Sequence, residues 1–566
     1  MYILGIACFY HDSSATLLLD GKIVAAAQEE RFNRKKASSS FPILAINFCL
    51  KQADITIKDL DLIVFYEKPY LKFERVIKDH LKNYPFSLSN FLRVIPHWLN
   101  ERLSLPIEIE KQIGYKGKVL YVPHHYSHAS SAFFSSPFKQ AAIITADAVG
   151  EYDTLTIGIG HKNQIKLIKK LSYPDSLGLL YTTISTYLGF NANSGEGRVM
   201  AFAALGEPKY LDIFKKIVHV KPDGSFQLDR KYFSFNRGSK MFNKNLEKIL
   251  GPARDMGKTY EENVEQRYFD IASSLQVLLE EIIVKIANYT YKVTNQKRLC
   301  LAGGVFLNCV ANTKILKETP FKEIFIQPAA GDAGGSLGAV LYTYHQFFNK
   351  PRSTFQMKDA FLGPEFSEKE ILQTLRKNQA IFKKLSNQTL VKLVAKKIYE
   401  NKIIAWFQGR MEFGPRALGH RSILANACNK NIKKLLNEKI KHREWFRPYG
   451  ILIPEDKVDK YFNENIKNPF MLMVGTIKEN KKELIPSATH CDGSSRLQTI
   501  NKDIHGLLFD VIEEFEKISG IPIMINTSFN DNNEPIVCNP QDAYNCFMKT
   551  DLDFLIMGNY IVSKSK

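Results

Sequence analysis

Three of the chain's thirteen histidines fall within five positions, at His124, His125 and His128. The apolar residues 118–122 before them predict a strand. Pro123 is typical of a helix's first turn, because the N–H that proline lacks would have no partner there. On such a helix His124 and His128 stand one turn apart on the same face, so their imidazoles can hold a metal ion together.

Two carboxylates strengthen the metal hypothesis. Asp147 directly follows an apolar run, Ala141–Ala146, that predicts a buried strand, and Asp332 lies in the glycine-rich turn Gly331–Gly335. Acidic residues at strand ends and in tight turns are typical ligand carriers. Two imidazoles with two carboxylates form a mixed nitrogen and oxygen site, which favours Fe(II) or Mn(II) over a thiolate-bound structural zinc. The alternative is a chance H-x-x-x-H pair packed in a core.

A second group of residues is suited to phosphate. The stretch Gly409–Ser422 contains three arginines among glycines, and Arg416 lies in a Gly-Pro-Arg loop that forms no regular solvated face. Arg496 and the segment containing Asn526 and Ser528 add another cation with amide and hydroxyl donors. Rigid guanidinium groups with loop donors are what a polyanionic phosphate ligand needs.

The elements that must position these residues show an internal repeat. Two series of three short strands are predicted: Tyr2–Phe9, Ala15–Leu19 and Lys22–Ala27, then Ala141–Ala146, Thr154–Gly160 and Gln164–Leu171. Each series has an aspartate in its first turn, Asp12 and Asp147, and each leads into helical segments. The pattern predicts a mixed α/β, duplicated domain of the actin/sugar-kinase/Hsp70 type, although two unrelated meanders are the alternative.

In that superfamily the first-turn acids and glycines face a nucleotide cleft. Asp12 is therefore a candidate nucleotide-binding residue. The short strand Leu299–Ala302 followed by Gly303, Gly304 and Asn308 is another, because paired glycines let backbone amides approach a nucleotide closely. A tight structural turn explains the same glycines. Helices are predicted over Phe41–Lys51, Pro85–Leu103, Tyr268–Val293 and Asn429–Arg447.

Length and composition indicate a two-domain protein. A chain of 566 residues exceeds a single core, and periodicity lapses near Asn349–Gly363, so the expected division is residues 1–350, a linker and entry segment at 351–385, and residues 386–566. No apolar run approaches the ~18 residues of a membrane span. The start of the chain does not resemble a signal peptide. Eight scattered cysteines without C-x-x-C favour reduced thiols and a cytoplasmic protein.

The net charge of +19 makes nucleic acid a candidate partner. However, the lysines are dispersed and mixed with acidic residues. Compositional bias therefore ranks first as the explanation, anionic small substrates second and nucleic acid third.

The combined motifs resemble the NodU/CmcH/TobZ-type O-carbamoyltransferase family over almost the whole chain. The shared stretches are His11-Asp-Ser-Ser-Ala15, Gln28–Arg34, His124-x-x-x-His128-Ala, Gly303-Gly-Val-x-Leu-Asn308, Gly-Asp332-x-Gly-Gly, Phe413–Ser422, Arg443–Pro448, Asp492-Gly-x-x-Arg496 and Asn526–Asn530. One departure is Arg198, which stands where the family pattern has lysine and would change the reach of that charge toward an acceptor.

The resemblance implies a two-step enzyme. A C-terminal YrdC-like domain would activate carbamoyl phosphate with ATP and Mg²⁺ to carbamoyladenylate, and the N-terminal domain would transfer the carbamoyl group to a hydroxyl. By position, His124, His128, Asp147 and Asp332 match an iron-type site, with Fe(II), Mn(II) or Zn(II) as the ion. His11 and Lys36 match transfer residues, and His11 is the candidate base for the hydroxyl, the alternative being a turn histidine packed on the sheet. The residues matching the set that handles phosphate and nucleotide are Arg416, Lys441, Arg447, Arg496, Asn526 and Ser528.

The expected partner is a small-molecule or sugar acceptor with a free hydroxyl, with no membrane, and a homodimer is a further expectation. Two other functions remain open from the sequence. One is a synthase of the tRNA threonylcarbamoyladenosine type, which would need RNA binding. The other is a non-catalytic ATP-binding scaffold, which leaves the arginine loops of the second domain without a role.

Overall fold

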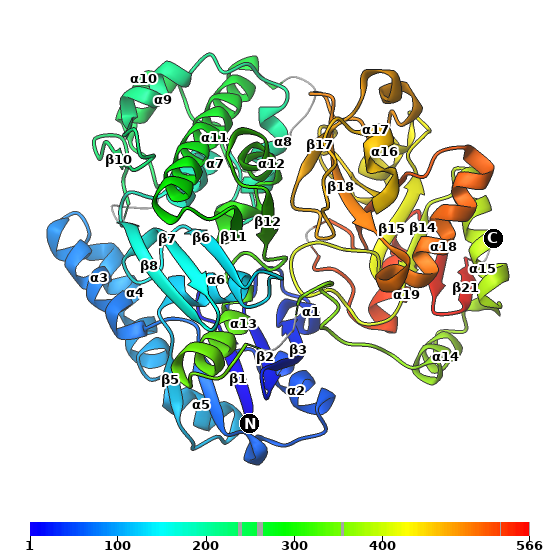
Figure 1. Cartoon of the computed structure of the whole chain (residues 1–566), viewed down its shortest axis with the longest axis horizontal. Helices are drawn as coiled ribbons and strands as arrows, with labels where there is room; N and C mark the ends of the chain where they lie inside the picture. Colours follow the sequence, from blue (N-terminus) through cyan, green and yellow to red (C-terminus); the bar gives the residue numbers. More distant parts are fainter. Residues whose placement is uncertain (236–239, 257–263, 353–355, 533, 565–566) are drawn as a thin grey trace. The chain divides into compact units, whose positions relative to one another are not determined.

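The computed structural model describes residues 1–235, 240–256, 264–352, 356–532 and 534–564. It divides the chain into two compact units. The first unit comprises Met1–Glu29 and Ala37–Met357, and the second comprises Glu30–Lys36 and Lys358–Lys566. Figure 1 traces the elements of both units along the chain.

The first sheet of the first unit has five strands in the order β3-β2-β1-β4-β5. These strands are β1 Tyr2–Ala7, β2 Ser14–Leu19, β3 Lys22–Gln28, β4 Leu62–Phe65 and β5 Val119–Tyr121. β1, β2 and β3 form an antiparallel meander, whereas β4 pairs parallel with β1 and β5 pairs parallel with β4. Asp20 and Gly21 join β2 to β3 with φ angles of 46° and 81°, as expected for an Asp-Gly hairpin.

The second sheet repeats this topology, with the order β12-β11-β6-β7-β8. Its strands are β6 Gln140–Ala146, β7 Asp153–His161, β8 Gln164–Ser172, β11 Arg298–Ala302 and β12 Glu323–Ile326. β6, β7 and β8 again form an antiparallel meander, and β11 and β12 again run parallel to the first strand of that meander. Strand order and direction therefore agree between the two halves. The predicted duplication is confirmed, and the alternative of two unrelated meanders is wrong.

Each half contains a helix that directly follows its last strand: α6 (His124–Phe133) after β5, and α13 (Ala333–Tyr342) after β12. The two helices pack against each other (Figure 1). A Cβ atom on Gly338 of α13 would lie 1.7 Å from the carbonyl oxygen of Ser127 of α6. The glycine therefore allows the two backbones to touch, and this contact sets the spacing between the residues carried by the two helices.

Gly338→Ala is expected to destabilise the protein, because an added methyl cannot fit between these backbones. Overpacking of this kind costs about 1–3 kcal/mol, so the melting temperature should fall by several degrees. The control is Gly197→Ala in α8 (Glu196–Ala203), where a Cβ atom would meet nothing within 4 Å. A helical glycine of this kind is replaced by alanine at no cost or with a small gain in stability. Equal melting temperatures for the two variants would contradict the tight contact.

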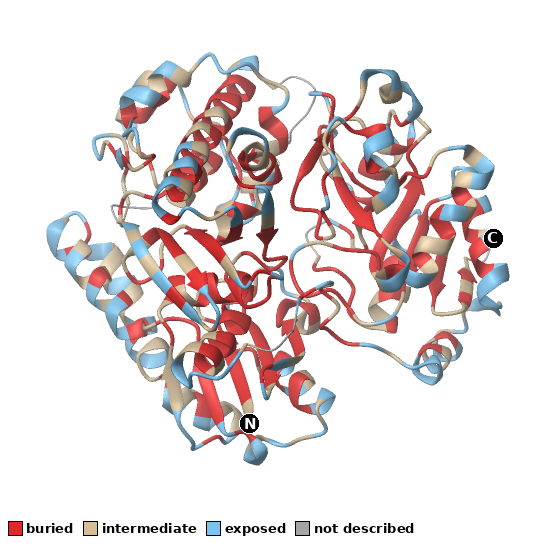
Figure 2. Cartoon of the chain, in the orientation of Figure 1, coloured by how far each residue is buried: buried red, intermediate tan, exposed pale blue. Residues whose placement is uncertain are grey.

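The other helices of the first unit follow the predictions with local differences. α2 (Ile43–Gln52) and α11 (Gln266–Thr294) confirm two of them. The helix predicted over Pro85–Leu103 begins only at Leu88 and changes from α4 (Leu88–His97) to a π-helical turn over Trp98–Arg102. In that turn Trp98 is buried and the guanidinium of Arg102 lies over its ring. Figure 2 shows the strands largely buried and much of the outer face of α3 and α4 exposed.

The second unit is built on one mixed sheet of nine strands in the order β13-β21-β20-β14-β15-β19-β16-β18-β17. The strands are β13 Ile381–Lys384, β14 Ile404–Phe407, β15 Arg421–Asn426, β16 Gly450–Pro454, β17 Val474–Thr476, β18 Ser494–Ile500, β19 Met524–Ser528, β20 Phe554–Met557 and β21 Tyr560–Ser563. Helices α15 (Asn387–Tyr399) and α18 (Lys502–Ser519) share one apolar cluster with the sheet, and α14 (Glu368–Lys377) and α19 (Pro540–Lys549) share another.

The division of the chain differs from the expected one in one segment, Glu30–Lys36. Within the expected linker and entry segment 351–385, α14 and β13 belong to the second unit, and Ile371 and Leu375 of α14 are buried in its core. Glu30–Lys36, expected in the first domain, also belongs to the second unit. There the guanidinium of Arg31 donates to the carbonyl oxygen of Gly414, and that of Arg34 donates to the carbonyl oxygen of Ile536.

The helix predicted over Asn429–Arg447 is wrong in its second half. Helical structure ends at Ile440, after α16 (Ile432–Leu435) and a π-helical turn over Leu436–Ile440. Lys441 turns inward at this point, is 3% exposed and donates hydrogen bonds to oxygens that follow β19. Long-range bonding therefore ends the helix. Among the described residues, no helix is both long and apolar enough to cross a bilayer.

Candidate metal centre and phosphate site

Four predicted ligands converge in the first unit. His124 and His128 come from α6, Asp147 follows β6, and Asp332 immediately precedes α13. One ligand atom of each lies within 4.8 Å of all the others. Nε2 of His128 lies 3.0 Å from Nε2 of His124, 3.0 Å from Oδ2 of Asp147 and 3.6 Å from Oδ1 of Asp332. All four residues lie at carboxyl ends of strands or at the starts of the helices that follow.

The donor set fits a divalent cation. Ligand bonds of ~2.0–2.2 Å place neighbouring donor atoms about 3.4 Å apart in a tetrahedral site, and Nε2 of His124 lies 3.3 Å from Asp147 and 3.7 Å from Asp332. Oδ1 of Asp332 is buried without a hydrogen-bond partner among the described residues, although a buried carboxylate oxygen is costly unless it is paired. A cation at the centre of the cluster would meet this oxygen.

Three further residues support the cluster, and the sequence pattern gave no sign of them. Glu151 accepts the backbone N–H of His124 at 3.0 Å. Glu67 lies with Oε2 3.8 Å from Nδ1 of His124 and 2.6 Å from Nζ of Lys72. A carboxylate behind a ligating imidazole orients the ring. All three residues are far from His124 along the chain, so only the fold brings them to that ring.

The two imidazoles differ in proton affinity. Burial acts to lower the pKa of His128, but the hydrogen bond with Asp147 and the nearby carboxylate of Asp332 raise this pKa to about 9. Burial lowers the pKa of His124 well below its usual value. His128 therefore carries a proton between the two carboxylates, while His124 is neutral. A bound cation would supply the positive charge that this proton supplies.

His11 and Asp12 lie beside the cluster, in the turn between β1 and β2 that corresponds to the turn containing Asp147. Nδ1 of His11 is 2.9 Å from Oδ2 of Asp12, and Nε2 is 3.9 Å from Oδ2 of Asp332. Burial acts to lower the pKa of His11, but the charge of Asp332 and the hydrogen bond with Asp12 raise it to about 9. The predicted base role of His11 therefore requires that a cation offset the charge of Asp332, because a protonated ring cannot accept a proton.

The glycine pair after β11 also lies against the cluster. A Cβ atom on Gly303, which has φ 102°, would lie 2.1 Å from the carbonyl oxygen of Ala146, and one on Gly304 would lie 3.0 Å from Oδ1 of Asp147. The side chain of Asn308 has a structural role: it caps α12 (Cys309–Glu318) and forms two hydrogen bonds with Gln276. The structure thus brings the glycines to the centre, while the Asn308 amide serves local structure.

In the second unit, two predicted phosphate residues share one row of the sheet. Asn526 of β19 pairs with Gly450 of β16, and Gly450 pairs with Arg496 of β18. Residues in register on adjacent strands point to the same face, so Asn526 and Arg496 flank a position without a side chain. Oδ1 of Asn526 is buried without a hydrogen-bond partner among the described residues, while its amide nitrogen donates to Ala417 and Gln498.

Lys441 and Ser528 lie at the end of the same strand. Nζ of Lys441 contacts Oγ of Ser528 at 3.3 Å and donates to Oδ1 of Asn530 at 2.7 Å. Burial, followed by the charge of Arg443, lowers the pKa of Lys441 well below its usual value. Lys36, predicted with His11 as a transfer residue, belongs to this unit, and its charge adds to the lowering.

The arginines of the Gly409–Ser422 loop have different roles. Arg421 is fully buried, and its guanidinium donates to several backbone carbonyl groups, including those of Pro364 and Cys538. Arg410 donates to the carbonyl oxygen of Leu362. Both therefore hold the loop. Arg416 is half-buried next to Ala417, which Asn526 contacts, and Arg447 pairs with Glu444 at 3.3 Å.

Two family models match most of the chain. Residues 2–341 match the model described as carbamoyltransferase N-terminus, and residues 395–564 match the model described as carbamoyltransferase C-terminus.

Individual proteins are similar over the same length. An uncharacterized protein of Synechocystis is 41% identical, with 100% of this chain and 97% of that protein covered. Nodulation protein NolNO of Sinorhizobium fredii is 34% identical, with 98% of this chain and 79% of that protein covered. The solved structure of (R)-2-hydroxyglutaryl-CoA dehydratase component A from Acidaminococcus fermentans covers 61% of this chain and 98% of its own at 14% identity, with a TM-score of 0.32.

Proposed function

The chain belongs to the carbamoyltransferase family, and from this premise we propose that it activates carbamoyl phosphate with ATP and transfers the carbamoyl group to a hydroxyl. The intermediate is carbamoyladenylate, formed in the second unit and consumed in the first. The acceptor is a small molecule or a sugar, and Mg²⁺ accompanies ATP. Family membership itself makes the protein a transferase.

The observation that supports this proposal is the chemical contrast between the two sites. The first unit gathers two imidazoles and two carboxylates within 4.8 Å, a donor set for a cation. The second unit carries arginines, a lysine and amide groups at one row and one end of its sheet, a set suited to polyanions. One reaction that needs both sites is the activation of carbamoyl phosphate with ATP, followed by transfer of the carbamoyl group.

Activation proceeds in two chemical steps. Water cleaves carbamoyl phosphate to phosphate and carbamate, and a carbamate oxygen then attacks the α-phosphorus of ATP, so that pyrophosphate leaves and carbamoyladenylate forms. Arg416 and Arg496 balance the charge of the phosphates, and Asn526 and Ser528 offer polar groups that fix their position. Lys441 and Arg447 hold the segments that carry these groups.

Transfer breaks the bond between the carbamoyl carbon and the phosphate oxygen, and AMP leaves as the acceptor oxygen bonds to that carbon. His124, His128, Asp147 and Asp332 would hold a divalent cation, whose positive charge would stabilise negative charge developing on oxygen. His11 takes the proton of the acceptor hydroxyl once the charge on Asp332 is offset. Gly303 and Gly304 let the backbone approach the adenylate.

Release of pyrophosphate tests the proposal directly. Purified protein incubated with ATP, Mg²⁺ and carbamoyl phosphate is expected to release pyrophosphate, and omission of carbamoyl phosphate should abolish the release. The measurement is a coupled pyrophosphate assay. Pyrophosphate release that does not depend on carbamoyl phosphate would contradict the activation step. The absence of any pyrophosphate release would also contradict it, and would favour a non-catalytic scaffold.

A binding experiment separates a small-molecule acceptor from tRNA. With its dispersed lysines, the protein should bind mixed tRNA weakly, and binding should vanish by ~0.2 M salt without sequence preference, because phosphate contacts alone are salt-sensitive. Filter binding across a salt series measures this. Tight binding of one tRNA that persists at high salt would support the tRNA-modifying alternative.

A further inference from the structure

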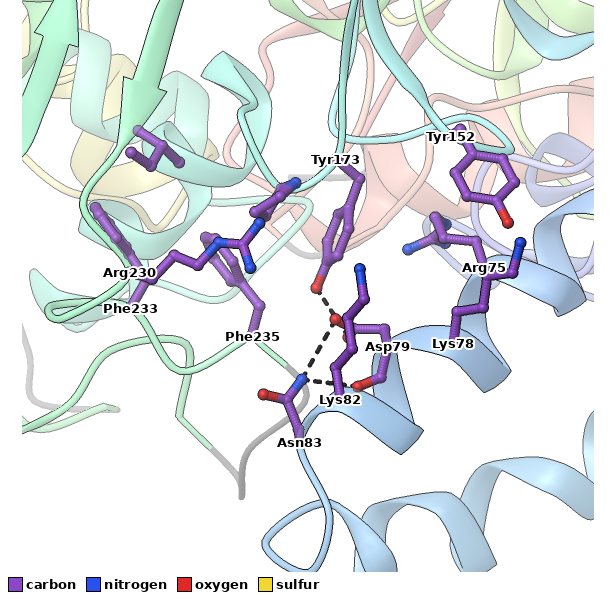
Figure 3. A pocket seen from close by; sticks show the side chains of 12 residues that line it. Arg75, Lys78, Asp79, Lys82, Asn83, Tyr152, Tyr173, Arg230, Phe233 and Phe235 are labelled. Atoms are coloured by element: carbon purple, nitrogen blue, oxygen red, sulfur yellow. Dashed lines mark hydrogen bonds between the residues drawn. The ribbon is translucent and has the colours of Figure 1, made fainter.

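A cationic pocket of about 140 Å³ opens in the first unit (Figure 3). Helix α3 (Pro69–Lys82) forms one wall, and the segments around residues 152, 173 and 228–235 complete it. The charged side chains that line it are four cations and a single carboxylate: Arg75, Lys78, Lys82, Arg230 and Asp79. None of the residues that line it takes part in the proposed activation or transfer.

The positive charge of the pocket is not neutralised from within. Arg75 is only 8% exposed, and its Nε has no hydrogen-bond partner among the described residues. Lys78 pairs with Glu74 outside the pocket. Among the described residues, no carboxylate oxygen lies within 4 Å of the side-chain nitrogens of Arg75, Lys82 or Arg230. Asp79 is engaged by the hydroxyl of Tyr173 at 3.0 Å and by the amide of Asn83. A buried guanidinium without a counterion is costly, so the pocket favours an anion.

Aromatic rings give the pocket a second chemical character. The rings of Phe233 and Phe235 are stacked with centroids 5.5 Å apart, and the guanidinium of Arg75 lies 4.9 Å from the centroid of Tyr173. In Figure 3 Arg230, Phe233 and Phe235 lie on one side of Tyr173, and Arg75 and Lys78 lie on the other. Flat aromatic faces beside cations suit a ring compound that carries an anionic group, as the apolar face of a sugar ring can pack on an aromatic ring.

Two segments that line the pocket also support the candidate metal centre. Helix α3 carries both Arg75 of the pocket and Lys72, which bonds to the Glu67 that faces His124. Tyr152 of the pocket directly follows Glu151, whose carboxylate accepts the backbone N–H of His124. A molecule anchored in the pocket would therefore be held by segments that also support the centre where transfer is proposed.

We propose that this pocket binds the acceptor, and that the acceptor is a sugar-like ring compound carrying a phosphate group near the hydroxyl to be carbamoylated. This inference rests on the function proposed above and names its substrate class. A volume of about 140 Å³ is below the ~300–1,000 Å³ of sites that enclose whole cofactors, so it accommodates a phosphate and the ring next to it.

Calorimetric titration of the full-length protein tests the inference without any carbamoyl chemistry. The probes are glucose 6-phosphate and N-acetylglucosamine 6-phosphate, each compared with its uncharged parent sugar. At least one phosphosugar is expected to bind tenfold or more tightly than its parent. Arg75→Gln should weaken that binding at least tenfold. Because Arg75 is buried and its loss could disturb folding, the double variant Lys82→Gln/Arg230→Gln, at two exposed positions, is the second arm and should weaken binding similarly.

Lys166→Gln is the matched control, since Lys166 is an exposed lysine of β8 outside the pocket, and it should leave the affinity unchanged. The inference would be overturned if neither phosphosugar bound more tightly than its parent sugar. Full affinity in the double variant would overturn it as well. Pyrophosphate release by the wild-type protein, measured in the same preparation, distinguishes the two proposals. Release without phosphosugar binding contradicts only the acceptor class, whereas binding without release contradicts the activation step.

Discussion

The double variant His128→Ala/Asp147→Ala is expected to lose its metal ion completely. Wild-type protein should contain about one Fe-class ion per chain, because His124, His128, Asp147 and Asp332 bring their donor atoms within 4.8 Å of one another. Even groups that only support metal ligands are worth about 10–100-fold in affinity, and this variant removes two ligands. Metal content by inductively coupled plasma mass spectrometry should fall from about one ion to a small fraction of one.

His125→Gln is the control for this experiment. His125 lies on the same helix and is equally buried, but its ring bonds to Oγ1 of Thr145 at 2.7 Å and to the carbonyl oxygen of Asp153 at 2.8 Å. The His125→Gln variant should therefore retain the metal ion even if its melting temperature is lower. Unchanged metal content in the double variant would contradict the metal assignment. An equal loss of metal in the control would mean that the substitutions disrupted the helix and not the ligands alone.

Local patterns in the sequence carried enough information for the duplicated fold of the first unit. Asp-Gly at residues 20–21 and short alternating apolar runs specify meanders through local geometry. The ligands His124 and His128 were predictable for the same reason, since their spacing of four residues is a local property of a helix. Asp147 and Asp332 were predictable because each follows an apolar strand or lies in a glycine-rich turn.

Residues that act through distant contacts could not be predicted in this way. Glu67 and Glu151 support His124 from segments 57 and 27 residues away, and no local pattern distinguishes them from other acids. The helix that ends at Ile440 has the composition of a longer one, but Lys441 is drawn inward by oxygens 87 to 89 residues further along the chain. Glu30–Lys36 likewise joins the second unit through arginine bonds to carbonyls about 380 and 500 residues away.

The two half-reactions are expected to separate by unit, so that Arg496→Ala and His128→Ala lose different steps. Arg496 shares a sheet row with Asn526, where phosphate charge must be balanced. A charge-assisted contact is worth roughly 1.5–3 kcal/mol, so its loss should slow carbamoyl-phosphate-dependent pyrophosphate release by about one to two orders of magnitude, and product formation with it. Ser495→Ala is the control, because Ser495 is the preceding residue of β18 and points to the opposite face of the sheet.

His128→Ala should behave in the opposite way. It leaves the second unit intact, so pyrophosphate is still released, at a rate limited by hydrolysis of the adenylate, yet no carbamoylated acceptor forms. Carbamoyladenylate supplied directly should restore product in Arg496→Ala and leave His128→Ala inactive, because only the first variant lacks the activation step. Product analysis by mass spectrometry with and without added adenylate measures both. If both variants lose pyrophosphate release, or both are rescued, activation and transfer share one site and the assignment of one step to each unit is wrong.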